Sequence, residues 1–144
     1  MDYSLGAYEC DVDTRKVTHV WKRPICHCHA NHDRTLWVGD QTPYNWKNEP
    51  CKVLFYDRGT NQELPIFSAL PEPPVERGKY HVDPHPQFVC GGKYVAATVT
   101  VGVETATVSL TPVKPLLENC RKNGREILEA PPTPGPSEWI LNRF

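Results

Sequence analysis

The chain has 144 residues, of which 39% are hydrophobic and 23% are charged, a size and a balance typical of one domain with a single core. Lys and Arg (16) nearly cancel Asp and Glu (17), leaving a net charge of -1. A chain with so little net charge has no strong electrostatic field to attract phosphate groups, which argues against a general nucleic-acid binder. No run approaches the roughly 20 apolar residues that a membrane-spanning helix needs, and residues 1–4 lack the basic and apolar parts of a signal peptide. We therefore expect neither nucleic acid nor a membrane as a partner.

Proline and cysteine depart from ordinary usage. The 15 prolines are about twice the average share of roughly 5% and argue against long helices. The 6 cysteines form an even set, which in a chain of this size favours a disulfide framework and secretion. They are Cys10, Cys26, Cys28, Cys51, Cys90 and Cys120. Their pairing stays open at this point.

The first half of the chain predicts one short helix followed by β structure. Residues 11–21 place apolar side chains at helical spacing behind an acidic start, and Pro24 limits them to two turns. Residues 35–38 predict a short strand. Residues 52–70 predict a hairpin with a turn at residues 58–61. Pro65 places the second strand of this hairpin at a sheet edge or a bulge, because proline has no N–H to donate.

The second half contains the strongest β pattern. Residues 93–101 and 103–110 alternate between apolar and polar side chains, which predicts a hairpin with one buried face. Before it, the proline-rich residues 71–86 predict an extended surface loop. After it, residues 116–123 predict a short helix with a glycine cap at Gly124. We expect one β-rich domain at residues 1–129 and a proline-rich C-terminal tail at residues 130–144.

The densest group of metal ligands is Cys-His-Cys-His-Ala-Asn-His at residues 26–32. Zinc prefers Cys and His in tetrahedral sets, but the usual finger spacings are not present. Two cysteines separated by one residue on an extended chain point to the same side, where each can reach a different partner. We therefore predict two disulfides here and no metal or other cofactor, with a zinc site as the alternative.

Candidate catalytic groups are scattered along the chain. They are His19, His27, His29, His32, Glu63, His81 and His85. No nucleophile elbow, phosphate-binding glycine loop or paired metal motif accompanies them, so each histidine is best interpreted as a solvated loop residue. Trp37, Tyr44 and Trp46 can stack on bases or sugars, although such aromatics more often cover the edge of a small core.

Four pieces of sequence together resemble one family. They are Tyr8-Glu9-Cys10, residues 42–48 (Thr-Pro-Tyr-Asn-Trp-Lys-Asn), residues 63–66 (Glu-Leu-Pro-Ile) and Cys120 after the strand that begins at Lys93. In order and spacing this is similar to the small fungal ribonucleases of the T1 type and to the ribonuclease-like secreted effectors of cereal mildews. The resemblance implies an α+β, mostly β fold: a curved antiparallel sheet with one short helix, stapled by disulfides.

The same resemblance implies a disulfide between Cys10 and Cys120. The catalytic glutamate of the family corresponds to Glu63, its phosphate-binding arginine falls near Lys93, and a motif histidine corresponds to Tyr44. The final catalytic histidine has no counterpart, because no histidine follows His85. Cleavage of RNA needs a general acid and a general base, and without this histidine the pair is incomplete. The resemblance therefore implies an inactive enzyme. The additional cysteines and the proline-rich tail depart from the family, and a β-sandwich effector family remains an alternative.

We therefore interpret the chain as a secreted, monomeric effector of a plant pathogen, with no catalytic activity of its own. It would bind a host plant protein, such as an immune receptor, outside the host cell or after delivery into it. The predicted contact residues lie on loops and in the tail: Trp37, Tyr44, Trp46, Glu72, His81, His85 and Trp139. The alternatives are an active ribonuclease that uses Glu63 with His81 or His85, a carbohydrate-binding module that uses Trp37, Tyr44 and Trp46, and a zinc-dependent fold.

Overall fold

The computed structural model describes residues 6–42, 50–71, 83–101 and 105–127. These residues form antiparallel strands and one helix, which confirms the α+β, mostly β class. In chain order the elements are β1 (Ala7–Cys10), β2 (Val17–Trp21), β3 (Cys28–Ala30), β4 (Leu36–Gln41), β5 (Cys51–Asp57), β6 (Gln62–Leu70), β7 (Gln87–Val89), β8 (Tyr94–Val101), β9 (Thr105–Pro112), α1 (Val113–Asn123) and β10 (Arg125–Glu126). No helix in this part of the chain is long and apolar enough to span a bilayer.

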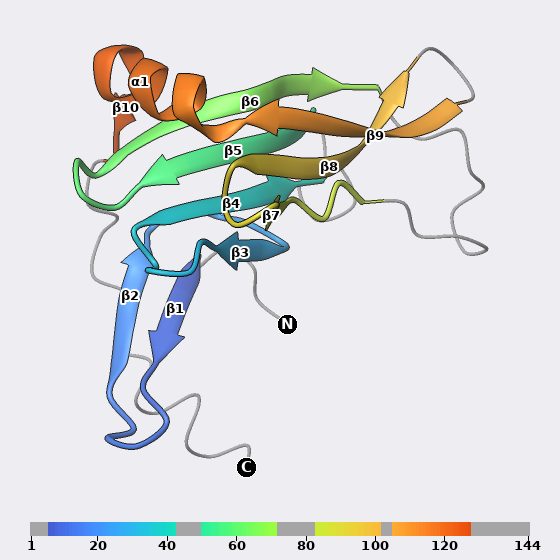
Figure 1. The fold of residues 1–144 in the computed structure, drawn as a ribbon. Helices are drawn as coiled ribbons and strands as arrows, with labels where there is room; N and C mark the ends of the chain where they lie inside the picture. Colours follow the sequence, from blue (N-terminus) through green and yellow to red (C-terminus); the bar gives the residue numbers. More distant parts are fainter. Residues whose placement is uncertain (1–5, 43–49, 72–82, 102–104, 128–144) are drawn as a thin grey trace, which may run out of the picture.

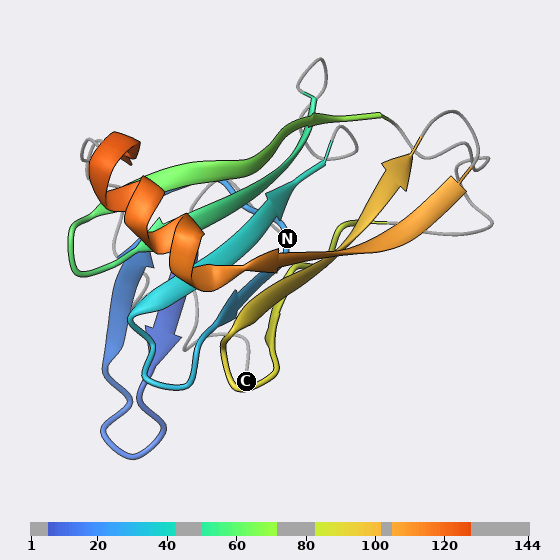
Figure 2. The ribbon, with the colours of Figure 1, turned by 45° about the horizontal axis from the view of Figure 1, so that its top comes forward.

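The strands belong to three sheets. The central sheet has the order β10-β6-β5-β4-β3, a second sheet has the order β7-β8-β9, and β1 and β2 form a hairpin. Figure 1 shows the hairpin projecting below the central sheet and α1 lying above it, both near the end of the sheet where β6 begins. Figure 2 shows the second sheet running beside the central one, with α1 following directly from β9.

Both faces of the central sheet are buried, because alternate side chains of β4 and β5 enter different cores. On one face Trp37, Leu54 and Tyr56 pack with Trp21 of the hairpin. The other face forms a second cluster with the second sheet and α1: Leu36, Val38, Phe55, Val95, Val113, Leu116 and Cys120. A strand that is covered on both faces has a nearly continuous apolar sequence, as the run Val53-Leu54-Phe55-Tyr56 illustrates.

Both predicted hairpins of the chain are confirmed. β5 pairs with β6, and β8 pairs with β9. Pro65 lies opposite Leu54, beside a register shift, and β10 pairs with β6 only at Gln62 and Glu63. The missing N–H of Pro65 therefore falls at a bulge on an edge segment, as its ring requires. Val95, Ala97 and Val99 are buried, as the alternation predicts, but Val101 and the apolar residues Val108 and Leu110 of β9 are exposed, so the prediction of a buried face along the whole hairpin is wrong.

The predicted helix at residues 11–21 is wrong. Asp11 accepts hydrogen bonds from the backbone N–H groups of Asp13 and Thr14 at 3.1 and 2.7 Å, so the acidic start forms a side-chain-stabilised turn. β2 follows this turn and carries Val20 and Trp21 into the core. The apolar spacing was compatible with either structure, and pairing with β1 decided between them.

The helix near the C-terminal end is confirmed with corrected ends. α1 begins at Val113, so Pro115 occupies its first turn, where a missing N–H costs little. Gly124 has a φ of -65° and is therefore no left-handed cap. A Cβ at this position would lie 2.3 Å from the carbonyl oxygen of Cys120. Glycine is required here by the close approach of the backbone.

The disulfide framework is not seen. All six cysteines lie in the described residues, and none of them forms a disulfide. Cys10 is exposed at the end of β1, whereas Cys120 is buried in α1, and Figure 1 shows these two elements at opposite ends of the molecule. The Cys120 thiol instead donates a hydrogen bond to the carbonyl oxygen of Gln62 at 3.4 Å. The predicted disulfide between Cys10 and Cys120 is therefore not seen in this fold.

Candidate metal site

The site begins where the chain enters β3. The Cys26 N–H donates to the carbonyl oxygen of Asp40 at 2.8 Å, and the Asp40 N–H donates to that of His27 at 3.1 Å. Residues 26 and 27 thus extend the pairing of β3 with β4. The chains approach closely because residue 39 is glycine: a Cβ there would lie 3.1 Å from the His27 carbonyl oxygen and from the Trp21 ring.

Asp40 is the buried anchor of this site. Its side chain is 0% exposed. Its carboxylate accepts the backbone N–H of His27 at 3.0 Å and that of His85 at 2.9 Å, and it lies 3.1 Å from the His27 Nδ1 atom. A carboxylate beside Nδ1 favours the proton on that nitrogen and leaves Nε2 as the ligand atom. Asp40 therefore holds both segments of the site in place and orients the His27 ring.

The second segment of the site is residues 83–86. Asp83, Pro84 and Pro86 are buried, and the carbonyl oxygen of Pro84 accepts the N–H of Thr98 in β8 at 2.8 Å. The prediction of an exposed loop is therefore wrong at residues 83, 84 and 86 and agrees with the structure only at His85. Residues 72–82, which make up most of that loop, lie outside the described residues.

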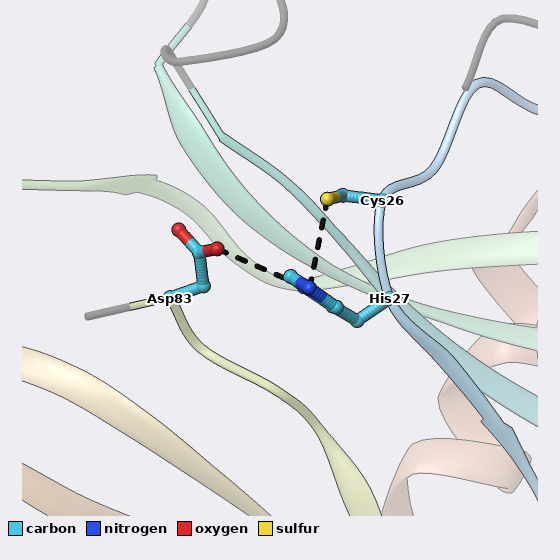
Figure 3. Close-up of side chains that lie close together, drawn as sticks. All are labelled: Cys26, His27 and Asp83. Atoms are coloured by element: carbon cyan, nitrogen blue, oxygen red, sulfur yellow. Dashed lines mark hydrogen bonds and ion pairs between the residues drawn. The ribbon is translucent and has the colours of Figure 1, made fainter. Parts of the chain in front are cut away.

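Cys26, His27 and Asp83 converge at this place, as Figure 3 shows. One ligand atom from each residue lies within 4.8 Å of the others. The two contacts involve different nitrogens of the ring: the Cys26 Sγ atom is 3.7 Å from His27 Nε2, whereas Asp83 Oδ2 is 3.9 Å from Nδ1, the nitrogen that Asp40 also contacts. A thiolate, an imidazole and a carboxylate are all ligands of divalent transition metals. The two disulfides predicted at residues 26–32 are not seen, and the arrangement is compatible with the alternative of a metal site.

His85 borders the same cluster. Its ring centroid lies 3.8 Å from that of His27, at an interplanar angle of 34°. Its backbone has a φ of 42°, a left-handed conformation that is uncommon outside glycine. The hydrogen bond from its N–H to Asp40 holds this conformation. His85 is exposed, and its ring lies against the His27 ring.

The remaining cysteine of the motif lies outside the cluster. Cys28 is the first residue of β3 and pairs with Gly39. Desolvation and the charge of Asp40 both raise the pKa of its thiol above the ordinary value. The Cys28 thiol is thus held in its neutral form, two residues away from the sulfur that joins the cluster.

The structure brings together only part of the predicted site. Trp37 is wrong as a contact residue, because it is buried in the core and its indole N–H donates to the Arg34 carbonyl oxygen at 3.1 Å. His85 is exposed, as predicted. Cys51 is buried and Cys90 is exposed between β7 and β8. The other predicted contact residues lie outside the described residues: Tyr44, Trp46, Glu72, His81 and Trp139.

Glu63 has a structural environment. It is buried in β6, accepts the indole N–H of Trp21 at 3.3 Å, and lies 3.4 Å from the Arg23 guanidinium. None of its recorded partners within the described residues is a histidine. Among the described residues Glu63 thus has a structural role between Trp21 and Arg23, whereas His81, one of its predicted catalytic partners, lies outside them.

Two carboxylates of the site were missed in the sequence. Asp40 stands among the apolar residues of β4, where a charge needs a buried partner, and Asp83 stands in the run His-Val-Asp-Pro-His, which was interpreted as an exposed turn. A charged residue in a strand covered on both faces was the available signal. Nothing in the sequence indicated that residues 26–27 and residues 83–85 meet.

Comparison with known proteins gives a fold likeness and no family. No family model matches the chain, and no curated protein matches it. A solved structure described as "Oligogalacturonate lyase in complex with manganese" matches with a TM-score of 0.59 and 22% sequence identity. The match covers 73% of this chain and 28% of that one. The chain thus spans little more than a quarter of that protein's length, and the likeness shows the fold alone.

Proposed function

We propose that this chain binds a divalent metal ion through Cys26, His27 and Asp83. The convergence of their three ligand atoms within 4.8 Å carries the proposal. Asp40 supports it, because a carboxylate that binds the second nitrogen of a metal-ligating histidine is the usual orienting partner of such a site. His85 is placed to add a fourth ligand after a small movement of its exposed ring.

The test uses the whole chain, stripped of metal with a chelator and then dialysed against Zn²⁺, Co²⁺ or Mn²⁺. We expect at least one of these ions to bind with one ion per chain, measured by elemental analysis and native mass spectrometry. Binding should also raise the free energy of unfolding by about 2.7 kcal/mol when the free ion is at a hundred times its dissociation constant. His27→Ala and Asp83→Asn should each weaken binding tenfold or more.

His32→Ala is the matched control, because His32 belongs to the same motif but is exposed in the turn before β4. It should bind metal as the unmodified chain does. If none of the three ions binds, or if His27→Ala and His32→Ala bind equally well, the proposed metal site is wrong.

A second candidate is recognition of acidic sugars through the bound ion. The solved structure with this fold is described as a lyase of an acidic oligosaccharide in complex with manganese. This candidate requires that His85 stays outside the coordination shell, because only a site with three protein ligands leaves a metal position open to a substrate oxygen. A uronate would supply that oxygen from its carboxylate. Calorimetric titration with oligogalacturonate, with and without metal, tests this candidate. Binding that is absent under both conditions excludes it.

The interpretation as a secreted effector stays a prediction. The buried position of Trp37 removes one of its contact residues, and the disulfides on which the expectation of secretion depends are not seen. The resemblance to T1-type ribonucleases is likewise a prediction, which the comparisons do not test.

A further inference from the structure

Cys26 gives the candidate site a donor that distinguishes among metal ions. Its sulfur lies 3.7 Å from His27 Nε2, and its backbone N–H is fixed to the Asp40 carbonyl oxygen at 2.8 Å. On its N-terminal side, Ile25 is buried in the core with Trp21 and Trp37. The position of this sulfur is therefore set by β4 and by the core.

Donor chemistry decides which ion such a site prefers. Thiolate is a soft ligand that favours zinc and similar ions, whereas manganese, magnesium and calcium favour oxygen ligands. Manganese also stands at the weak end of the affinity order for divalent metals, in which cobalt and zinc bind more tightly. A site with one sulfur, one nitrogen and one oxygen donor should therefore reject manganese.

We propose that Cys26 makes this site selective for zinc-like ions over manganese. The inference rests on the proposed metal site and names the ion class that the site takes. The solved structure with the same fold is described in complex with manganese, so a thiolate ligand would give this chain a different ion from the one in that description.

Cobalt provides the most direct test, because Co²⁺ bound to a thiolate has a strong sulfur-to-metal charge-transfer absorption in the near ultraviolet. We expect this band when Co²⁺ is added to the metal-free chain and expect Zn²⁺ to abolish it by displacement. Competition between ions should give a preference for Zn²⁺ over Mn²⁺ on the order of a thousandfold.

Variants then assign the selectivity to one sulfur. Cys26→Ser should remove the charge-transfer band and reduce the Zn²⁺ preference by about a hundredfold, and Cys26→Asp should increase the relative affinity for Mn²⁺ because it replaces sulfur with oxygen. Cys28→Ser is the matched control: it removes the neighbouring sulfur, which lies outside the cluster, and should keep both the band and the preference.

The outcomes separate the two proposals. If Co²⁺ binds without the band, or if Mn²⁺ binds as tightly as Zn²⁺, the role of Cys26 is wrong and the metal site itself stands. If no ion binds, both proposals are wrong. The charge-transfer band is measured on the unmodified chain. The role of Cys26 is therefore tested even if a variant folds poorly.

Discussion

Asp40 and Asp57 are both buried carboxylates, with 0% and 1% of their surface exposed, and they lie at opposite ends of the same strand pair. Asp40 in β4 faces Val53, and Asp57 in β5 faces Leu36. At one end Asp40 binds two backbone N–H groups and a histidine ring. At the other end Asp57 binds the Gly59 N–H and the Arg121 guanidinium, at 3.0 and 2.8 Å.

The difference lies in what compensates each charge. Arg121 carries a permanent charge, so Asp57 is fully paired and fixes α1 against the central sheet. His27 carries no permanent charge, and its second nitrogen remains available for a ligand. Two buried carboxylates of the same sheet thus have different uses: Asp57 holds the fold together, whereas Asp40 holds a metal ligand and the backbone of two segments.

The largest effect is expected from Asp40→Asn. The Asn side chain keeps one acceptor oxygen, but its NH2 group faces either the His27 N–H or the His85 N–H, which bind different oxygens of Asp40. One buried hydrogen bond is therefore lost and replaced by two opposed donors, and the charge that faces the His27 ring is removed. We expect the metal-free chain to lose about 3–5 kcal/mol of its free energy of unfolding, measured by urea denaturation. Asp13→Asn, at an exposed position in the β1–β2 turn, should stay within about 0.5 kcal/mol of the unmodified chain. A loss of less than about 1 kcal/mol for Asp40→Asn would contradict its role as anchor.

Asp57→Asn should cost less, about 1–2 kcal/mol. The Asn oxygen can still accept the Gly59 N–H, and Arg121, whose side chain is 56% exposed, returns to water without its partner. A double-mutant cycle with Arg121→Ala should give a coupling energy of about 1 kcal/mol that falls as salt is added. A loss as large as that of Asp40→Asn would remove the distinction between the two ends.

The sequence predicted those parts of the fold that depend on local patterns. The alternation in residues 93–101 and the Arg-Gly-Thr-Asn turn before β6 each determined a hairpin without reference to the rest of the chain. The error at residues 11–21 arose because Val17, Val20 and Trp21 suit a helix and a strand equally, and only the distant contact of Trp21 with Tyr56 decides. Pairing between segments is the information that a local pattern lacks.

The site was predictable only in part for the same reason. The motif at residues 26–32 identified Cys26 and His27 as metal ligands to consider, but the finger spacings assume that all ligands lie near one another in sequence. Here Asp83 comes from a segment more than 50 residues away, brought in by the bond from Thr98 to Pro84. The even count of cysteines favoured disulfides, and nothing local showed that Cys120 faces a helix-sheet interface.

The two ends of the sheet also differ in their thiols, and the smallest expected effect concerns Cys120, which lies at the Asp57 end. Burial, together with the charges of Asp57 and Glu63, raises the pKa of this thiol from 9.0 to about 11. In the range between these values the unfolded chain ionises the thiol and the folded chain does not. The contribution of Cys120 to stability is therefore complete below pH 9 and declines as the pH rises toward about 11.

This contribution can be measured by urea denaturation of the unmodified chain and of Cys120→Ala at several pH values. The difference between their free energies of unfolding removes the effect of other groups that titrate between pH 9 and about 11. It should shift in favour of the alanine variant as the pH rises above 9. In the native chain a thiol reagent at pH 8 should label the exposed Cys10 and Cys90 and leave Cys120 unmodified. A Cys120 as reactive as Cys90, or a difference that does not depend on pH, would show that the Asp57 end of the sheet is open to solvent and that the contrast with the Asp40 end is overstated.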